Sequence, residues 1–263
     1  MGATSTAAVN GTDITFTDSG GPGPAVIFSH GLLMDHTMFD PQVAALEGLA
    51  RVITWDERAH GGTRAQGPFS YWDSANDLWG LLDHLGIERA VLAGMSQGGF
   101  LSLRAALSQP ERVESLILMG TQAGVEDEEK QASYDMLHEI WNSDGPAPVQ
   151  EIVASIILGE GDWADWYAKW STWAESFSGE FTHAFRCLSD RDDITDRLRE
   201  ITCRALVIHG TADAAIPMER SEAMAEGLGG QVALLRVDGG THAVNLTHPD
   251  PVNNAIKDFL GLD

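Results

Sequence analysis

Ser96 has the sequence context of a nucleophile. It lies at the centre of the segment G-M-S-Q-G at residues 94–98, directly after an apolar run at 90–93 and before a helical pattern at 97–107. A strand that turns sharply into a helix projects such a serine above the edge of a sheet, and Gly94 and Gly98 leave room for the crowded backbone. The helix N-terminus adds N–H groups and partial positive charge. The pattern predicts attack by Ser96 on an acyl carbonyl.

A serine hydroxyl needs a base, and the base needs an acid that orients it. Asp213 follows the apolar run 205–208, and His242 follows the run 231–237, so both stand on loops after strands. The order Ser96, Asp213, His242 is that of a nucleophile-elbow enzyme. Coincidence is the alternative, because the chain has nine histidines and many acids. His248 is a second candidate base, but Pro249 and Asp250 after it indicate the start of the final helix.

Two backbone N–H groups are needed to hold the oxyanion of a tetrahedral intermediate. The first candidate is the N–H of Gln97, directly after the nucleophile. The second is the N–H of Leu32, because His30 and Gly31 mark a sharp turn after the apolar run 25–28. This prediction leaves the side chain of Leu32 free to line an acyl pocket.

The elements that must position these residues alternate along the chain. Continuous apolar runs are typical of strands covered on both faces, as in a parallel sheet. They occur at 25–28, 51–55, 90–93, 115–119, 205–208 and 231–237, after an alternating strand at 12–17. Helical patterns occur at 41–49, 72–85, 97–107, 218–228 and 251–260. The alternation predicts an α/β fold with a mostly parallel twisted sheet flanked by helices.

Residues 122–200 break this alternation, since they contain several helical stretches and no convincing strand. We expect a helical cap there, inserted late in the sheet between a first core part at 1–121 and a second at 201–263. Trp163, Trp166, Trp170 and Trp173 form one helical stripe, which either packs the insertion onto the sheet or roofs a substrate pocket. The predicted pocket is lined by Leu33, Met95, Trp163, Trp166, Trp170 and Arg186.

Composition restricts the partners. The 263 residues include 39 acidic and 16 basic side chains, a net charge of −23, which disfavours nucleic acid and anionic membrane surfaces. Cys187 and Cys203 form no metal-binding or disulfide pattern. No apolar stretch is long enough for a membrane span, and no signal pattern opens the chain. We expect a cytoplasmic protein that acts on a small-molecule ester, with no metal or organic cofactor, as a monomer or a homo-oligomer.

These motifs together resemble the α/β-hydrolase superfamily, and in particular its compact capped members: carboxylesterases, cofactor-free haloperoxidases or perhydrolases, and enol-lactonases. The resemblance rests on His30-Gly31, residues 56–61, 94–99, 210–217 and 239–242. Many members have D-x-R-G-H-G at the second of these segments, where this chain has Ala59 in place of the first glycine. The resemblance implies that Ser96, Asp213 and His242 form a catalytic triad. Epoxide hydrolases and haloalkane dehalogenases carry an aspartate nucleophile, so they are excluded.

Ester hydrolysis through an acyl-enzyme is the leading interpretation, and several alternatives stay open. The same triad serves perhydrolases, which pass the acyl group to hydrogen peroxide. A lactone or a carbon–carbon substrate with a carboxylate fits if Arg186 faces the pocket rather than an ion pair. A non-enzymatic receptor would not need a complete triad. A hydroxynitrile lyase would be expected to place a lysine in the pocket, and the chain has only Lys130, Lys169 and Lys257.

Overall fold

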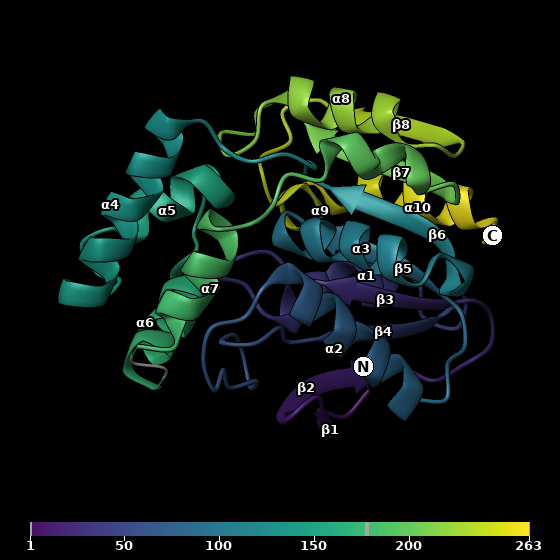
Figure 1. Cartoon of the computed structure of the whole chain (residues 1–263), viewed down its shortest axis with the longest axis horizontal. Coiled ribbons are helices and arrows are strands. Elements are labelled where there is room, and N and C mark those ends of the chain that lie inside the picture. The colour runs from purple at the N-terminus through teal and green to yellow at the C-terminus, as the bar shows by residue number, and fades with distance from the viewer. Residues whose placement is uncertain (1, 177–178, 263) are drawn as a thin grey trace.

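A single twisted sheet forms the centre of the protein in a computed structural model that describes residues 2–176 and 179–262 (Figure 1). The strand order is β1-β2-β4-β3-β5-β6-β7-β8. β1 and β2 pair in antiparallel fashion, as do β2 and β4, and every pairing from β4 to β8 is parallel. The predicted α/β fold with a mostly parallel sheet is confirmed.

The strands are β1 (Ser5–Val9), β2 (Thr12–Asp18), β3 (Ala25–Ser29), β4 (Arg51–Trp55), β5 (Ala90–Met95), β6 (Val113–Met119), β7 (Arg204–Gly210) and β8 (Val232–Val237). The α-helices are α1 (Asp40–Ala45), α2 (Tyr71–His84), α3 (Gln97–Ser108), α4 (Glu128–Asp144), α5 (Gln150–Ile157), α6 (Ala164–Ser176), α7 (Phe181–Ser189), α8 (Met218–Gly227), α9 (Val244–Thr247) and α10 (Pro249–Leu260). Short 3-10 turns are η1 (His36–Phe39), η2 (Pro110–Arg112) and η3 (Thr195–Glu200).

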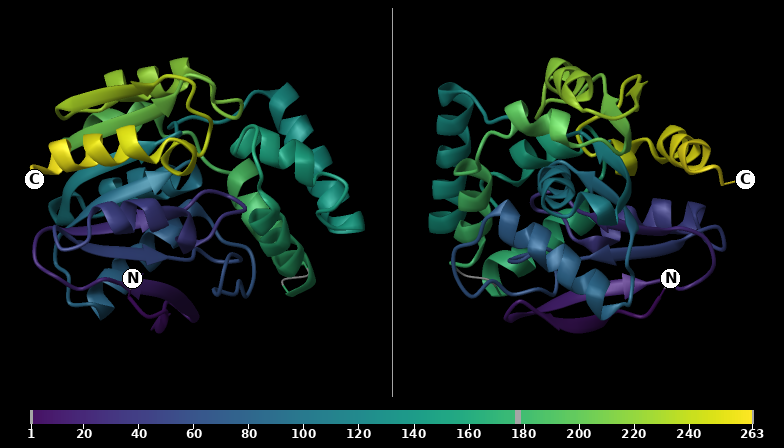
Figure 2. Two further views of the ribbon diagram at one scale, coloured as in Figure 1. Left: turned by 180° about the vertical axis from the view of Figure 1, so that it is seen from behind. Right: turned by 45° about the vertical axis from the view of Figure 1, so that its right-hand side comes forward.

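Both faces of the sheet are buried along the central strands β3 to β7, which explains their continuous apolar runs. Along β5, Leu92 belongs to one core cluster while its neighbours Val91 and Ala93 belong to the other. This alternation follows from the two-residue repeat of a strand. The helices α2 and α3 cover one face, and α1 and α10 cover the opposite face (Figures 1 and 2). The sheet is therefore a rigid base whose loops are held from both sides.

The helices α4 to α7 lie between β6 and β7 in the sequence and stand together beyond one end of the sheet (Figures 1 and 2). No strand interrupts them in the described part of residues 122–200. Our division into core and cap at residues 121 and 200 stays a prediction, and residues 1, 177–178 and 263 within it lie outside the described residues.

Two local features differ from the sequence expectations. The sequence does not predict strand β1, because its residues are small and include no large apolar side chain. A tight turn at Asn10 and Gly11, with φ of +46° and +82°, pairs it with β2. The first helix ends at Ala45 rather than Leu49.

None of the helices in the described residues has the length and apolar character that crossing a bilayer requires.

Candidate active site

The candidate site lies where the sheet changes winding direction. β3 sits between β4 and β5, so the chain leaves β3 toward one side for β4 and later returns to its other side for β5. Crevices at the carboxyl ends of strands form at this switch point, because the following loops diverge there. The loop after β3 carries Leu32, and the turn after β5 carries Ser96. The two segments meet at one cavity.

Ser96 occupies a strained turn between β5 and α3. Its φ of +51° and ψ of −114° lie in a region that residues with a side chain rarely adopt. The turn is too tight for side chains at the flanking glycines: a Cβ on Gly94 would lie 2.1 Å from the Gly98 oxygen, and one on Gly98 would lie 1.9 Å from the Ser29 oxygen. The Ser96 N–H donates to Met119 O at 2.9 Å, so β6 helps to hold the turn.

His242 and Asp213 form a buried pair. The His242 Nδ1 atom lies 2.9 Å from Asp213 Oδ2 and 3.0 Å from Oδ1. Asp213 Oδ1 also accepts the backbone N–H groups of Ala215 and Ile216 at 2.8 and 2.9 Å. Burial alone raises the pKa of Asp213, but His242 and the Ile216 N–H outweigh it and hold this pKa below its usual value. The carboxylate is therefore charged and fixed, while Nε2 of His242 makes no hydrogen bond within the described residues and the residue lines the cavity.

The two predicted oxyanion donors are free of competing partners. Within the described residues, the backbone N–H groups of Leu32 and Gln97 donate no hydrogen bond. Gln97 is the first residue of α3, where intrahelical acceptors do not exist. Both N–H groups are thus available to a substrate oxygen.

Two buried histidines hold the loop that carries Leu32. The His30 Nε2 atom accepts the Glu57 N–H at 3.0 Å, and the His60 Nε2 atom accepts the Leu33 N–H at 3.3 Å. The remaining ring nitrogens donate to the carbonyl oxygens of Gly31 and Arg58. Burial lowers the pKa of both rings, so each is neutral and each hydrogen has a defined partner. His30-Gly31 and residues 56–61 are therefore hydrogen-bonded to each other, and together they fix the loop after β3.

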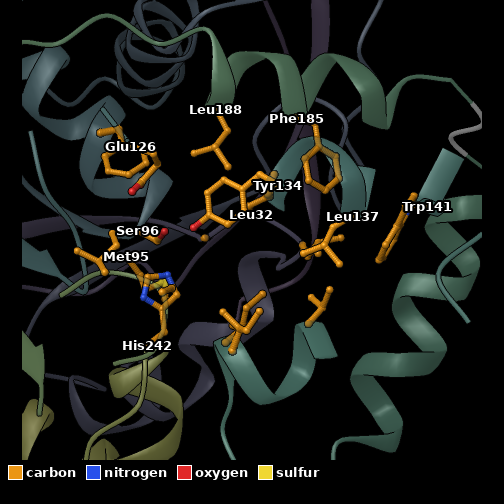
Figure 3. Close-up of a pocket in the computed structure, with 18 residues that line it drawn as sticks. Leu32, Met95, Ser96, Glu126, Tyr134, Leu137, Trp141, Phe185, Leu188 and His242 are labelled. Atoms are coloured by element: carbon orange, nitrogen blue, oxygen red, sulfur yellow. The ribbon is translucent and has the colours of Figure 1, made fainter. Parts of the chain in front are cut away.

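The cavity beside Ser96 and His242 is mainly apolar (Figure 3). Its walls come from the loops of the core and from α4, α5 and α7 of the insertion. The lining residues are Gly31, Leu32, Leu33, Met95, Ser96, Phe100, Glu126, Tyr134, Leu137, Trp141, Val153, Ile156, Ile157, Phe185, Leu188, Ala215, Ile216 and His242. Ser96 and His242 lie at one end of this cavity and Trp141 at the other (Figure 3). Of the predicted lining residues, Leu33 and Met95 are among these.

The structure places the other four predicted lining residues elsewhere. Trp170 is fully buried and its Nε1 donates to Leu33 O at 2.6 Å, so it packs the insertion onto the core. Trp163 turns back to Gly159 O, and Trp166 stacks with the Lys169 ammonium. Arg186 lies outside the cavity, half exposed, with Asp135 at 3.9 Å. The stripe contacts the core with one face, whereas helices α4, α5 and α7 roof the cavity.

Sequence reasoning missed Glu126 and Tyr134, the two polar residues of the insertion that line the cavity. Glu126 is paired with Arg191 at 3.1 Å and Lys130 at 3.5 Å. The Tyr134 hydroxyl points toward Ser96 (Figure 3). Neither stands in a motif; Tyr134 lies on α4 and Glu126 in the segment directly before it, and only the docking of this part of the chain brings them to the cavity. His248, the second candidate base, does not line the cavity; it is the residue directly before α10.

Metal ligands of the usual kind do not come together in this fold. Among residues 2–176 and 179–262, no three His, Cys, Asp or Glu side chains are grouped so as to hold a metal ion. Both Cys187 and Cys203 are free thiols.

Glu57 is a buried carboxylic acid that contacts Gln97, directly after Ser96. It is 2% exposed, and its Oε2 atom accepts a hydrogen bond from Nε2 of Gln97 at 2.5 Å, while Oε1 is buried and has no partner among the described residues. Burial raises the pKa of Glu57 to about 8, although the hydrogen bond from Gln97 opposes this shift. The side chain is therefore protonated in the folded protein at neutral pH.

We expect this proton to make stability depend on pH. The unfolded chain loses the Glu57 proton near its ordinary pKa of 4.5, and the folded chain keeps it to about 8. Between those values the folded state binds more protons, so the contribution of Glu57 to the free energy of unfolding falls by about 1.4 kcal/mol per pH unit as pH rises. Glu57→Gln removes this contribution and keeps an acceptor for Gln97.

Urea unfolding of the wild type and Glu57→Gln at about pH 5.5 and about pH 7.5 checks this expectation. The variant should gain stability relative to the wild type at the higher pH. Parallel pH dependences of the two proteins would show that Glu57 is ionised in the folded state.

Comparisons with known proteins agree with the fold. The profile of a family described as alpha/beta hydrolase fold matches residues 24–143, and that of a family described as TAP-like protein matches residues 185–261. A putative carbamate hydrolase RutD of Rhizobium rhizogenes is 30% identical over 245 residues, which cover 89% of this chain and 92% of that protein. The 3-oxoadipate enol-lactonase 1 of Acinetobacter baylyi is 25% identical, over 90% of this chain and 88% of that protein.

A solved thermophilic esterase from Thermogutta terrifontis superimposes with a TM-score of 0.86 at 28% identity, over 98% of each chain. The chain belongs to the α/β-hydrolase family and is an enzyme of that family. The relatives include lactonases, carbamate hydrolases and esterases, so the family alone leaves the bond that is cleaved undefined.

Proposed function

We propose that this protein is a serine hydrolase that cleaves uncharged, hydrophobic carboxylic esters through an acyl-enzyme. Ser96 Oγ attacks the ester carbonyl while Nε2 of His242 takes its proton, and Asp213 holds the ring in the required tautomer. The N–H groups of Leu32 and Gln97 stabilise the oxyanion. His242 then returns the proton to the leaving alcohol, and water activated by the same ring releases the acid.

One observation carries this proposal: Ser96 and His242 share one end of an apolar cavity, and His242 is paired with a buried, charged Asp213. A nucleophile, a base and an orienting acid in this order are the minimum for acyl transfer by serine. The vacant N–H groups of Leu32 and Gln97 lie on the two segments that border Ser96.

The cavity wall favours an uncharged substrate. Among the described residues that line it, Glu126 is the only Asp, Glu, Lys or Arg, and it carries no positive charge. Arg186, the residue that would receive a substrate carboxylate, forms its ion-pair contact with Asp135 outside the cavity. A carboxylate in an apolar cavity without a cationic partner pays a large desolvation cost. The observation supports alkyl or aryl esters over lactones that carry a carboxylate.

The length of the cavity leads to a prediction about acyl chains. Leu137 lies between the Ser96 end and Trp141 (Figure 3). We expect Leu137→Trp to block the inner part, so that the ratio of kcat/KM for p-nitrophenyl hexanoate to that for the acetate falls about 10-fold or more, given about 0.8 kcal/mol for each buried methylene. Met136→Trp is the matched control, because Met136 is 58% exposed on the same helix. Its ratio should equal that of the wild type.

Charged esters complete the test. The wild type should cleave p-nitrophenyl butyrate about 10-fold or more faster than the p-nitrophenyl half-ester of succinate, since the buried carboxylate has no cationic partner. Equal or faster turnover of the half-ester would refute the substrate class, and turnover that survives the loss of the Ser96 hydroxyl would refute the mechanism.

A further inference from the structure

A second histidine contacts Asp213, the acid of the proposed triad, from the interior of the protein. His209, on β7, is fully buried, and its Nε2 atom lies 3.3 Å from Asp213 Oδ2. The same Nε2 atom lies 2.8 Å from the carbonyl oxygen of Ile216. Asp213 thus contacts two imidazole rings, His242 beside the cavity and His209 in the interior. The mechanism above uses only the first.

The hydrogen bonds of His209 define its tautomer. Burial lowers the pKa of His209, although the Asp213 charge and the Ile216 carbonyl oppose this shift, so the ring is neutral and carries one hydrogen. Nε2 faces two oxygen atoms, which both require a donor, so the hydrogen is on Nε2. The Nδ1 atom lies 2.6 Å from the Ser221 oxygen, and the single hydroxyl hydrogen of Ser221 serves either Nδ1 or the carbonyl oxygen of Thr121.

His209 thereby holds the loop that presents Asp213. It donates to the carbonyl oxygen of Ile216, and the N–H of the same Ile216 donates to Asp213 Oδ1 at 2.9 Å. The ring of His209 therefore fixes the carbonyl group of Ile216, and the carboxylate of Asp213 fixes its N–H group. Loss of the ring would release the Ile216 carbonyl and leave a buried polar group without a partner.

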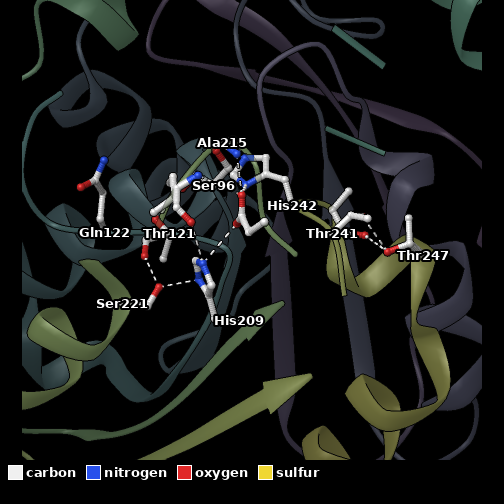
Figure 4. A network of polar contacts seen from close by, with 12 residues as sticks. Ser96, Thr121, Gln122, His209, Ala215, Ser221, Thr241, His242 and Thr247 are labelled. Carbon is white, nitrogen blue, oxygen red and sulfur yellow. Dashed lines mark hydrogen bonds and ion pairs between the residues drawn. The ribbon is translucent and has the colours of Figure 1, made fainter. Parts of the chain in front are cut away.

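The contacts continue to the nucleophile. The Ser221 oxygen lies 2.8 Å from the carbonyl oxygen of Thr121, and the Thr121 hydroxyl donates to the carbonyl oxygen of Ser96 at 2.8 Å (Figure 4). Ser221 belongs to α8 and Thr121 to the loop after β6. A chain of polar contacts therefore leads from Asp213 through His209, Ser221 and Thr121 to the backbone of Ser96. His209 and Ser221 are both fully buried, so water does not compete for these contacts.

We propose that His209 is a positioning residue that couples the Asp213 loop to the Ser96 turn and so keeps the nucleophile and the His242–Asp213 pair in register. The proposal rests on the serine hydrolase function proposed above. Small displacements of reacting groups reduce rates strongly while binding of the substrate changes little, because only the transition state requires the full alignment. The effect of losing His209 should therefore appear in kcat rather than in KM.

The test compares His209→Leu with the conservative His209→Gln. Leucine fills the volume without donating a hydrogen bond, and we expect kcat for p-nitrophenyl butyrate to fall about 30-fold with KM nearly unchanged, within the effect of misplacement. Glutamine offers an N–H group toward Ile216 O and Asp213, and should restore kcat to within about 5-fold of the wild type. Ser221→Ala removes the contacts of Ser221 with both His209 and Thr121 but leaves the contacts of His209 with Ile216 and Asp213 in place, so its kcat should lie between those of the two His209 variants.

A control separates positioning from general stability. Val207→Ala, on the same strand, removes buried volume without touching the chain of contacts. It should lower the free energy of unfolding and leave kcat of the folded protein unchanged. If His209→Leu also changes stability alone, with wild-type kcat, His209 has no positioning role.

A spectroscopic readout does not require turnover. The proton of His242 Nδ1 in its hydrogen bond to Asp213 gives a low-field NMR signal, and we expect this signal to shift or broaden in His209→Leu and to recover in His209→Gln. An unchanged signal in His209→Leu overturns the inference. Failure of the proposed function is a separate result, recognised by ester turnover that persists in Ser96→Ala.

Discussion

Ser96→Ala is expected to lower kcat/KM for p-nitrophenyl butyrate by about 10⁴-fold or more, because the variant has no oxygen to attack the carbonyl. The fold should persist. Alanine retains the backbone N–H that bonds to Met119 O, and within the described residues the Ser96 hydroxyl makes no hydrogen bond that folding would lose. Stopped assays with enzyme at high concentration, together with circular dichroism, measure the two quantities.

A fluorophosphonate probe gives an independent reading of the same prediction. It should label Ser96 in the wild type, identified by peptide mass spectrometry, and should not label Ser96→Ala. Ser108→Ala, at the other end of α3, is the matched control and should keep both labelling and turnover. Labelling of a different residue with full activity in Ser96→Ala would require another nucleophile.

Asp213→Asn is the second substitution with a large expected effect, about 10⁴-fold in kcat. Asp213 Oδ1 accepts the N–H groups of Ala215 and Ile216, so the oxygen of an asparagine amide will occupy that position. Its NH₂ group then replaces Oδ2 and faces Nδ1 of His242, while the Nε2–H of His209, which lies farther away at 3.3 Å, keeps the carbonyl oxygen of Ile216 as its acceptor. Since an NH₂ group donates, Nδ1 must accept, and the ring hydrogen moves to Nε2, where it blocks removal of the Ser96 proton.

The shape of the site should survive this change, so KM is expected to stay within a few-fold of the wild type. Asp238→Asn on the neighbouring loop provides a control, because Asp238 is exposed and contacts Thr211 rather than His242. A kcat of Asp213→Asn within about 10-fold of the wild type would mean that the tautomer of His242 is set by another group.

The positions of the core elements could be predicted from the sequence because local patterns determine them. The apolar runs that became β3 to β7 are continuous because both faces of the sheet are buried there, whereas β8, at the edge of the sheet, is mostly half-buried or exposed. Ser96, Asp213 and His242 could be named because each follows such a run, and because Gly94 and Gly98 leave room for a tight turn at Ser96. Strand β1 could not be predicted, because its stability comes from pairing with β2 rather than from its own residues.

The chemistry of the cavity wall was decided by tertiary structure. The tryptophan stripe has the period of a helix, but this period does not determine which surface of the core the helix contacts. In the structure Trp170 contacts Leu33 O, and α4 places Tyr134 and Leu137 at the cavity instead. The same holds for His209, which the sequence shows only as the residue directly after the apolar run 205–208. Its contacts with Asp213 and Ser221 arise from the packing of β7 against α8 and the loop after β6. Local sequence determines where strands end and chains turn, whereas long-range packing determines which side chains face one another across those ends.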